Sequence, residues 1–436
     1  MILKKDLYFK KKILIYGLGI SGISCLNHLK VKNTVRCFDD NLKKLKFYNL
    51  KKYLISKKEI YKIKFDHIII SPGIDILKFS LKNYLKQNKS KICTDLDVFY
   101  SIYPDNFKIA ITGTNGKSTT AKLLCDILKK SKFDCRLTGN IGNAVLKEKN
   151  ISKRTIFVIE VSSYQISYSK FFKPDYCILL NISADHLERH RTFNNYIKTK
   201  FQLIYSLKKN NYAFLNKSDP LFKKFLINKK MKSKIINVKS KLSQKDRKLV
   251  ENIYFKNLNN QQNLAFVLKV CSKLKIKKST IFSVVNKFKP LSFRQQIIHD
   301  SNYLRIINDS KSTSFASSIN LINNLDRIFW VLGGLPKKGD KLNLDKKNNI
   351  SKIYIYGKHK SFFEKFFKNK FKCSKFNELK QAIKQASLDI SEDKLDKKIN
   401  FVFSPCAASF DKFKNFEERG KYFNYLVNLY KIKNVR

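Results

Sequence analysis

Long hydrophobic runs are missing from this sequence. No stretch reaches the roughly 18 consecutive apolar residues of a membrane-spanning helix, and residues 1–10 lack the apolar core of a signal peptide. We therefore expect a cytoplasmic protein that is not inserted into a membrane.

Cysteine pairs with metal-binding or redox spacing are also missing. The nine cysteines show no C-x-x-C spacing, and several lie within apolar segments. Cysteine behaves as a small hydrophobic residue when it is buried. We therefore predict buried, unpaired thiols in a reducing compartment.

Arginine is scarce, although the formal net charge is +57. The lysines are scattered over the whole length, and Lys, Asn, Ile and Phe are enriched together. A nucleic-acid-binding surface usually gathers its cations on one face or element. We attribute the charge to drift in nucleotide composition, and expect a monomer that binds no nucleic acid. The positive field would still attract anionic substrates.

Short runs rich in Ile, Val, Phe and Tyr alternate with helix-like segments, which is typical of an α/β protein with mostly parallel sheets. The expected strands are 13–16, 67–70, 109–112, 156–161, 176–181, 327–333, 353–357 and 401–405. A length of 436 residues suggests two or three domains. Polar, Pro-containing segments at 101–106 and 289–294 mark the candidate boundaries.

The strongest functional signal is an apolar strand that runs into Gly113-Thr-Asn-Gly-Lys-Ser118. Its two glycines permit a turn whose amide groups face phosphate oxygens, and the following helix would point its positive end at them. Lys117 would neutralise phosphate, and Ser118 could hold Mg²⁺. The strict P-loop pattern has glycine where this chain has Ile111. We predict a nucleoside triphosphate site with a shortened loop.

A second glycine-rich turn, Tyr16-Gly-Leu-Gly-Ile-Ser-Gly22, follows the first strand, and Asp39 stands twenty residues after Gly19. This order predicts a dinucleotide-type fold in which an acid at the end of the second strand could bind a ribose. The segment Ser71-Pro-Gly73 would meet the same crevice, although it could also be a plain turn.

Other polar residues follow expected strands. Glu160 ends an apolar run where a carboxylate could complete a Mg²⁺ shell. His186 and His190 have the spacing of a zinc pair, but no third ligand is evident and the glutamate between them is misplaced for a zinc protease. The segment 308–313 is dense in polar groups, which indicates a site. Ser409 is expected to cap the helix that follows it.

In this order the segments resemble the Mur ligases over nearly the whole chain. The segments that carry the resemblance are Gly113–Ser118, Gly139-Asn-Ile-Gly142, Glu160-Val-Ser-Ser163, Asp185-His-Leu-Glu-Arg-His190, Arg294, Asn308-Asp-Ser-Lys-Ser-Thr313 and Ser404–Gly420. The last two resemble the branch of the family that adds D-glutamate.

The resemblance implies three domains: a Rossmann-like domain (1–98) that holds a UDP-substrate, a central P-loop ATPase domain (99–290) and a C-terminal Rossmann-like α/β domain (291–436). It implies ATP-driven formation of an amide in peptidoglycan precursor synthesis, with UDP-N-acetylmuramoyl-L-alanine and D-glutamate as substrates. The carboxylate of the first substrate would take the γ-phosphate, and the amine of the second would displace it. Fixed cations and amide donors would be the main catalytic resource.

The resemblance also assigns roles to residues. Catalytic roles fall to Lys117, Glu160, His186 and Lys200, and two Mg²⁺ ions would be held by Ser118, Glu160, His186 and a carbamylated Lys200, with Lys198 as a nearby alternative. ATP contacts fall to Gly113, Thr114, Asn115, Gly116, Lys117, Ser118, Thr119, Asn260, Arg294 and Asp309. UDP-substrate contacts fall to Ile20, Ser21, Asp39, Asp40, Ser71, Pro72, Gly73 and Asn140. D-Glutamate contacts fall to Lys311, Thr313, Lys337 (preferred over Lys338), Ser409, Phe410 and Phe416.

The chain departs from the family pattern at Ser312 and Ser314, and Asn259 stands where the family usually has histidine. Sister ligases for diaminopimelate or lysine carry an Asp-Asn-Pro-Arg type segment that is absent here, and folate-glutamate ligases lack the UDP-type first domain. A basic P-loop hydrolase that binds nucleic acid would need Arg-rich patches. A nicotinamide dehydrogenase would leave Lys117 and Glu160 without a role.

Overall fold

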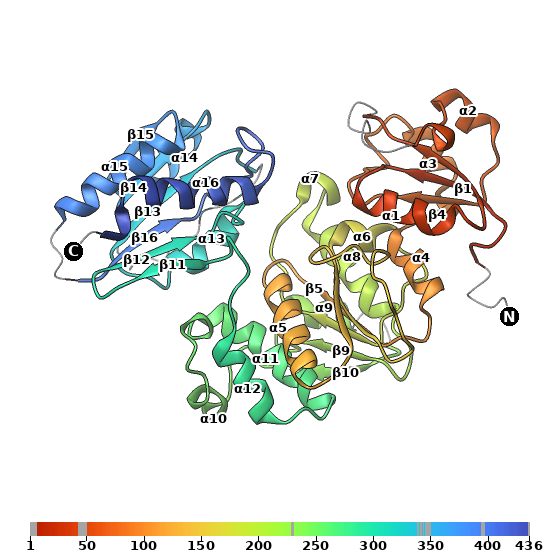
Figure 1. The fold of residues 1–436 in the computed structure, drawn as a ribbon, viewed down its shortest axis with the longest axis horizontal. Coiled ribbons are helices and arrows are strands. Elements are labelled where there is room, and N and C mark those ends of the chain that lie inside the picture. The colour runs from red at the N-terminus through yellow and green to blue at the C-terminus, as the bar shows by residue number, and fades with distance from the viewer. Residues whose placement is uncertain are drawn as a thin grey trace. The chain divides into compact units, whose positions relative to one another are not determined.

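The computed structural model describes residues 7–41, 50–227, 231–337, 340, 342, 344, 350–393 and 397–434. The chain divides into two compact units, Met1–Phe288 and Lys289–Arg436. Strands and helices alternate throughout, in three sheets whose pairings are parallel with one exception (Figure 1). The predicted α/β class is therefore confirmed, and all eight expected strands are present with ends shifted by a few residues. The division at 288/289 falls beside the expected boundary segment, and the limits of three domains stay a prediction.

The first sheet has the order β2-β1-β3-β4, with every pairing parallel. Its central strands are near-continuous apolar runs because helices or loops cover both faces of such a sheet. The strands are β1 (Lys12–Tyr16), β2 (Thr34–Phe38), β3 (His67–Ile70) and β4 (Ile92–Cys93), and the helices are α1 (Ile20–Leu29), α2 (Lys57–Lys62) and α3 (Lys82–Gln87).

The second sheet has the order β10-β9-β8-β5-β7-β6, again parallel. In its central strand β5 (Lys108–Thr112), Ala110 belongs to the core on one face, and Ile109 and Ile111 belong to the core on the other. The other strands are β6 (Cys135–Gly139), β7 (Ile156–Glu160), β8 (Tyr176–Leu179), β9 (Tyr212–Leu215) and β10 (Lys234–Asn237). The helices are α5 (Lys117–Lys130), α6 (Ser163–Tyr168), α7 (Leu187–His190), α8 (Phe193–Tyr205), α9 (Pro220–Ile227), α10 (Gln244–Lys248), α11 (Leu258–Lys273) and α12 (Lys278–Lys287).

Helix α4 (Asp95–Ile102) joins these two sheets. One buried cluster contains Ile15 of β1, Phe99 of α4 and Phe157 of β7. The rings of Phe99 and Phe157 meet edge to face with their centres 4.8 Å apart, a favoured aromatic geometry. The first two sheets therefore share a hydrophobic core, which explains why they form one compact unit.

The third sheet makes up the second unit and has the order β11-β12-β16-β13-β14-β15. Among the strand pairs that the structure describes in this sheet, β11–β12 at the edge is antiparallel and the others are parallel. The strands are β11 (Gln296–Asp300), β12 (Leu304–Asn308), β13 (Ile328–Gly333), β14 (Ile350–Tyr356), β15 (Cys373–Phe376) and β16 (Ile399–Phe403). The helices are α13 (Phe315–Ile322), α14 (Lys360–Phe367), α15 (Leu379–Glu392) and α16 (Phe416–Leu429).

The cap of helix α16 differs from the prediction. The helix begins at Phe416, and the side chain of Asn415 accepts a hydrogen bond from the backbone N–H of Glu418 (2.7 Å). Ser409 lies one loop earlier in the chain, so the prediction that it caps this helix was wrong. Asn415 fills the role because it directly precedes the first helical residue.

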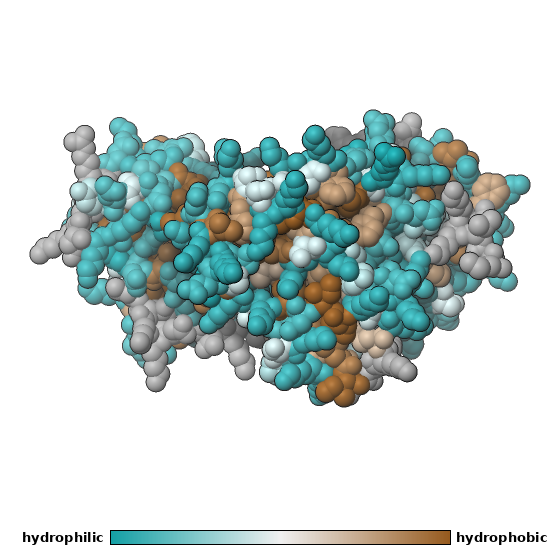
Figure 2. Space-filling view, turned by 90° about the horizontal axis from the view of Figure 1, so that it is seen from below, coloured by the Kyte–Doolittle hydropathy of each residue, from teal (hydrophilic) through white to brown (hydrophobic). Residues whose placement is uncertain are grey.

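The polarity of the surface and the burial of the cysteines agree with what the composition predicts. The face drawn in Figure 2 is mostly hydrophilic, with apolar residues gathered in a few places. All nine cysteines are free, and only Cys373 is partly exposed, which confirms the predicted buried thiols. Within the described parts of the chain, no helix is both long and apolar enough to cross a bilayer.

The carboxylate of Asp97 fastens α4 to the segment after α6. It is fully buried, and its Oδ1 accepts hydrogen bonds from the Ser169 hydroxyl (2.8 Å) and from the backbone N–H groups of residues 170–172. Burial raises the pKa of this carboxyl. Removing the acceptor would leave several buried donors without partners.

We expect Asp97→Ala to lower the free energy of unfolding of the first unit by about 3 kcal/mol. Urea denaturation followed by far-ultraviolet circular dichroism measures this loss. Asp105→Ala is the matched control, because Asp105 is exposed and its loss should cost under about 0.5 kcal/mol. Equal stabilities for the two variants would contradict the role given to Asp97.

Candidate functional site

The predicted phosphate loop lies between β5 and α5, and the helix begins at Lys117. Gly113 (φ 153°) and Gly116 (φ 82°) have positive φ, which glycine adopts without strain. A Cβ on Gly116 would lie 2.1 Å from Oδ1 of Asn263, so this position also lacks room for a side chain.

Asn181, just beyond the end of β8, holds the loop in place. Its backbone oxygen accepts from the N–H of Thr114 (2.9 Å), and its Oδ1 accepts from the N–H of Asn115 (2.9 Å). The hydroxyl of Thr114 accepts from the N–H of Ser183 (3.0 Å). The start of the loop is therefore fixed by the neighbouring strand, and its conformation is largely preformed.

Lys117 and Lys200 share one acceptor. Nζ of Lys117 donates to the backbone oxygen of Gly113 (2.8 Å), and Nζ of Lys200 donates to the same oxygen (2.9 Å). Lys200 is only 1% exposed. Burial, and then the charge of Lys117, lower the pKa of Lys200 well below its usual value. Lys198, the alternative from the sequence, is exposed.

Glu160 at the end of β7 is the centre of a second cluster. Its carboxylate is 1% exposed and accepts from the Ser118 hydroxyl (2.6 Å) at one oxygen and from Nδ2 of Asn140 (2.8 Å) at the other. The structure thus brings together a loop residue, a strand-end carboxylate and a residue after β6. These oxygens suit Mg²⁺, which takes few protein ligands and completes its shell with phosphates and water.

His186 opens the short helix α7 in a left-handed backbone conformation (φ 56°). Its Nδ1 lies 2.9 Å from the hydroxyl of Tyr164, and its Nε2 lies 3.4 Å from Oδ2 of Asp185. His190 is instead buried, 3.0 Å from the Ser163 hydroxyl, and burial lowers its pKa to about 4. Across the described residues, no three His, Cys, Asp or Glu side chains gather as a metal site.

The first-sheet residues converge at the carboxyl ends of β1, β2 and β3. Asp39 accepts from the backbone N–H of Leu18 (2.7 Å), Tyr16 bonds to Asp40 through its hydroxyl, and the Ser71 hydroxyl donates to the backbone oxygen of Gly17 (2.6 Å). The side chain of Ile20 is 68% exposed, and Ser21, Pro72 and Gly73 lie at least partly at the surface. The structure thus gathers these residues at the strand ends where the glycine-rich turn predicted a binding crevice, and their role stays a prediction.

Helix α11 approaches the loop with an asparagine that the sequence reasoning missed. Asn260 is buried and donates to the backbone oxygen of Tyr254 (2.9 Å), whereas Asn263 is the residue beside Gly116. The hydroxyls of Thr119 and Tyr254 lie 3.1 Å apart. The spacing of three residues between the asparagines was the available signal, since it places both on one helix face.

In the second unit, Asp309 follows β12 and is 5% exposed. Its carboxylate accepts from the backbone N–H of Gln295 (3.0 Å) and from the Ser404 hydroxyl (2.9 Å). Burial raises the pKa of Asp309 to about 7, while Arg294 and Arg419 oppose this rise.

The residues expected at D-glutamate lie in the same unit but are only partly grouped. Nζ of Lys311 lies 4.1 Å above the Phe416 ring, a cation–π contact. Paired backbone bonds between Leu335 and Ala408 bring the segment of Lys337 beside that of Ser409. Ser409 is buried, Phe410 is 72% exposed and Thr313 is partly buried. Lys338 lies outside the described residues.

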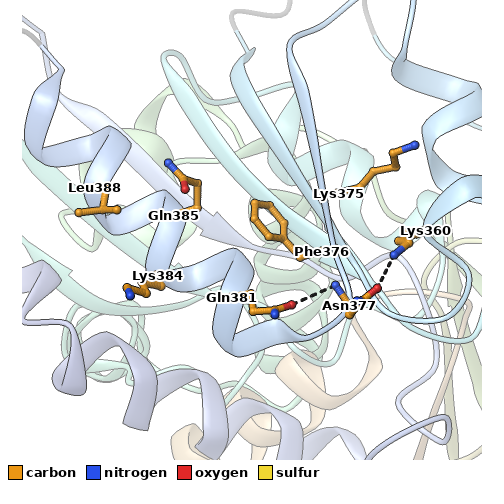
Figure 3. A pocket seen from close by; sticks show the side chains of 8 residues that line it. All are labelled: Lys360, Lys375, Phe376, Asn377, Gln381, Lys384, Gln385 and Leu388. Atoms are coloured by element: carbon orange, nitrogen blue, oxygen red, sulfur yellow. Dashed lines mark hydrogen bonds between the residues drawn. The ribbon is translucent and has the colours of Figure 1, made fainter.

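A surface groove of about 520 Å³ lies between β15 and α15 and contains none of the predicted site residues. Figure 3 shows Lys360 and Gln381 hydrogen-bonded to Asn377, and Lys375 pairs with Glu364 (3.0 Å). Several of its polar groups are thus already hydrogen-bonded or ion-paired within the protein.

Two family profiles match this chain: the Mur ligase middle domain over residues 111–286 and the Mur ligase MurD-like N-terminal domain over residues 11–93. The chain is 33% identical to the UDP-N-acetylmuramoylalanine–D-glutamate ligase of Rickettsia prowazekii, covering 95% of this chain and 97% of the relative. The chain belongs to the Mur ligase family. This Mur ligase is also 34% identical to the equally named enzyme of Buchnera aphidicola subsp. Schizaphis graminum, with the same coverage.

Solved structures share the fold of this Mur ligase. The MurF ligase of Thermotoga maritima in complex with ADP has a TM-score of 0.55 at 15% identity, covering 97% of this chain and 99% of the other. The UDP-N-acetylmuramate-alanine ligase MurC of the same organism has a TM-score of 0.54, also at 15% identity, covering 96% and 99%. Family membership makes the protein an ATP-dependent ligase that attaches an amino acid, as the sequence predicted.

The raised pKa of Asp309 predicts a pH-dependent stability. Between pH 3.8 and about 7 the folded state keeps a proton that the unfolded state has lost. Stability should therefore fall as pH rises through this window, by up to about 4 kcal/mol.

Trp330, the single tryptophan, is buried in β13 and reports unfolding of this unit by fluorescence. Asp309→Asn should flatten the fall in stability between pH 4 and 7. The exposed Asp326, changed to Asn, should leave the fall unchanged. A fall that persists in Asp309→Asn would refute this assignment.

Proposed function

We propose that this Mur ligase adds D-glutamate to UDP-N-acetylmuramoyl-L-alanine with ATP, in the synthesis of peptidoglycan precursors. The observation that carries the proposal is the buried Glu160 carboxylate, bonded on one side to Ser118 of the phosphate loop and on the other to Asn140. This cluster joins a residue expected at ATP to one expected at the UDP-substrate. The names of the near-full-length relatives support D-glutamate as the second substrate.

In the first step, an oxygen of the alanyl carboxylate attacks the γ-phosphorus of ATP. The bond from the γ-phosphorus to the bridging oxygen breaks, ADP leaves, and an acyl phosphate forms. Lys117 would exchange its bonds to the loop oxygens of Gly113 and Thr114 for bonds to phosphate. The amide groups at the start of α5 would hold the β- and γ-phosphates.

Ser118 and Glu160 are the residues that would hold Mg²⁺, which when bound would neutralise charge on the phosphates. His186 and a carbamylated Lys200 are the residues that would hold a second ion. Carbamylation forms a bond between the Lys200 nitrogen and the carbon of CO₂, with one proton lost to water. The lowered pKa of the buried Lys200 amine supports this role, because only a neutral amine reacts with CO₂.

In the second step, the amine of D-glutamate attacks the acyl carbon, and the tetrahedral intermediate expels inorganic phosphate. We place D-glutamate at Lys311, Thr313, Lys337, Ser409, Phe410 and Phe416, and ATP contacts at Asn260, Arg294 and Asp309. The Lys311 ammonium above Phe416 supports recognition of a substrate with two carboxylates. The domain limits 1–98, 99–290 and 291–436, a cytoplasmic location and a monomeric state stay predictions.

Phosphate release tests the proposed substrates. Protein with ATP, Mg²⁺ and UDP-N-acetylmuramoyl-L-alanine should release phosphate with D-glutamate and not with L-alanine, L-lysine or diaminopimelate. Release with another amino acid would move the protein to a sister activity. Release stimulated by RNA, or reduction of NAD, would reject the proposal.

Lys200→Ala tests the proposed carbamate. We expect turnover to fall at least about 100-fold, and short-chain carboxylates to restore part of it by replacing the missing carboxylate. Lys198→Ala, two residues away and exposed, is the control and should keep near-normal turnover. Normal turnover in Lys200→Ala would remove Lys200 from the site.

A further inference from the structure

Two arginines lie in the segment 185–191, the His186 segment, although arginine is scarce and lysine is abundant in this chain. Both reach the loop 71–76, which follows β3 of the first sheet: Arg189 bonds to Ile74 and Arg191 to Asp75. A guanidinium is planar and presents several donors in a fixed geometry, whereas an ammonium is a single point charge. Two arginines at one contact therefore indicate that the contact uses the shape of the guanidinium.

Arg189 is held by α6 and by the loop 71–76 together. Its Nη2 donates to the backbone oxygen of Ile74, a hydrogen bond that the positive charge strengthens. Its guanidinium also lies 5.1 Å from the ring centre of Tyr164 and 5.4 Å from that of Tyr168, both in α6. Cation–π contacts with two rings restrict where the guanidinium can lie. The backbone at Ile74 is therefore bonded to a donor whose own position is fixed.

Arg191 adds a second link at the next residue of the loop. Its Nη2 lies 3.4 Å from Oδ2 of Asp75, and its Nη1 donates to the backbone oxygen of Glu188 (2.8 Å). Asp75 is 5% exposed, and its Oδ1 accepts from the backbone N–H of Leu77 (3.0 Å). The His186 segment thus bonds to two adjacent residues of the loop 71–76.

The loop 71–76 is in direct contact with the glycine-rich turn of the first sheet. The Ser71 hydroxyl donates to the backbone oxygen of Gly17 (2.6 Å), and the backbone N–H of Ser71 donates to the oxygen of Tyr16 (2.9 Å). A Cβ on Gly17 would lie 2.8 Å from Cβ of Ser71 and 3.0 Å from the side chain of Ile74. A displacement of the loop would therefore also disturb the turn.

We propose that Arg189 is a positioning residue that, together with Arg191, fixes the loop 71–76 against the His186 segment and so sets the distance between the UDP-substrate contacts and the reaction centre. The proposal deepens the proposed function and rests on it for the identity of the substrate. The nucleotide and the reacting carboxylate lie at opposite ends of that substrate, so one molecule must contact both places. A fixed distance between them holds the carboxylate in a reactive position.

Amide hydrogen exchange of the unliganded protein tests whether Arg189 fixes the loop. The backbone N–H groups of Ile74, Leu77 and Lys78 are hydrogen-bonded within this part of the chain and report its opening. Arg189→Ala removes the bond to Ile74 and both ring contacts, and exchange at residues 74–79 should rise at least about 10-fold. Arg189→Lys keeps the charge without the planar guanidinium, and should give a smaller rise.

Substrate kinetics test whether the fixed loop serves the UDP-substrate. In the phosphate-release assay, Arg189→Ala should raise the KM for UDP-N-acetylmuramoyl-L-alanine about 10-fold, because its two contact regions are no longer held at one distance. The KM values for ATP and D-glutamate should stay within about twofold. Calorimetric binding of the UDP-substrate should weaken by about the same factor as its KM rises.

Lys170→Ala is the matched control. Lys170 follows α6 and is also a cation that donates to backbone oxygens beside the first sheet, those of Lys89 (2.9 Å) and Ser90 (2.6 Å). These oxygens precede β4, at the edge of the parallel sheet opposite to the loop 71–76. The variant should raise exchange near residues 89–93, and should change neither exchange at residues 74–79 nor the KM for the UDP-substrate.

Three results would overturn the proposal. They are unchanged exchange at residues 74–79 in Arg189→Ala, raised exchange there with an unchanged KM for the UDP-substrate, and equal effects of Arg189→Ala and Lys170→Ala on both quantities. If exchange rises as expected but the wild type does not use UDP-N-acetylmuramoyl-L-alanine, the proposed function fails, while the fixing of the loop by Arg189 stands on the exchange data.

Discussion

Two lysine side chains compete for the backbone oxygen of Gly113, and the candidate site is arranged around this contact. Lys117 reaches it from the first turn of α5, and Lys200 reaches it from the buried face of α8. Two like charges so close together disfavour the second charge, and the cost falls on the more buried amine. Burial of Lys200, and then the charge of Lys117, lower the pKa of Lys200 and so favour its neutral, reactive form.

The order of strands explains why the site forms at all. In the strand order β8-β5-β7-β6, the carboxyl end of each strand contributes one residue to the candidate site. These residues are Asn181 after β8, Gly113 after β5, Glu160 at the end of β7 and Asn140 after β6. Parallel strands place all four at one edge, where open α/β sheets bind their ligands. Asn115 and Asn181, which are 66 positions apart in the chain, become hydrogen-bonding partners in this way.

The sequence predicted those features that depend on local signals. Strand–turn–helix patterns located the loop and the carboxylate Glu160 because glycine, charge and apolar runs lie close together in the chain. The burial of individual side chains and the contacts between distant segments could not be predicted from the sequence. The choice between Lys200 and Lys198 depends on how α8 packs, and the contacts of Asn263 and Tyr164 depend on neighbouring elements. The cap at Asn415 was a local signal that we assigned to the wrong polar residue.

Helix α4 and the first two sheets contribute to one hydrophobic core, and this shared core also determines how the first unit unfolds. Ile15, Phe99 and Phe157 belong to one buried cluster. If one sheet unfolds, the side chains that the other sheet contributes to this cluster are therefore also exposed to solvent. Opening of one sheet thus carries the free-energy cost of opening both, and the pair behaves as a single cooperative unit. The glycine-rich turn of the first sheet and the phosphate loop of the second consequently persist or are lost together.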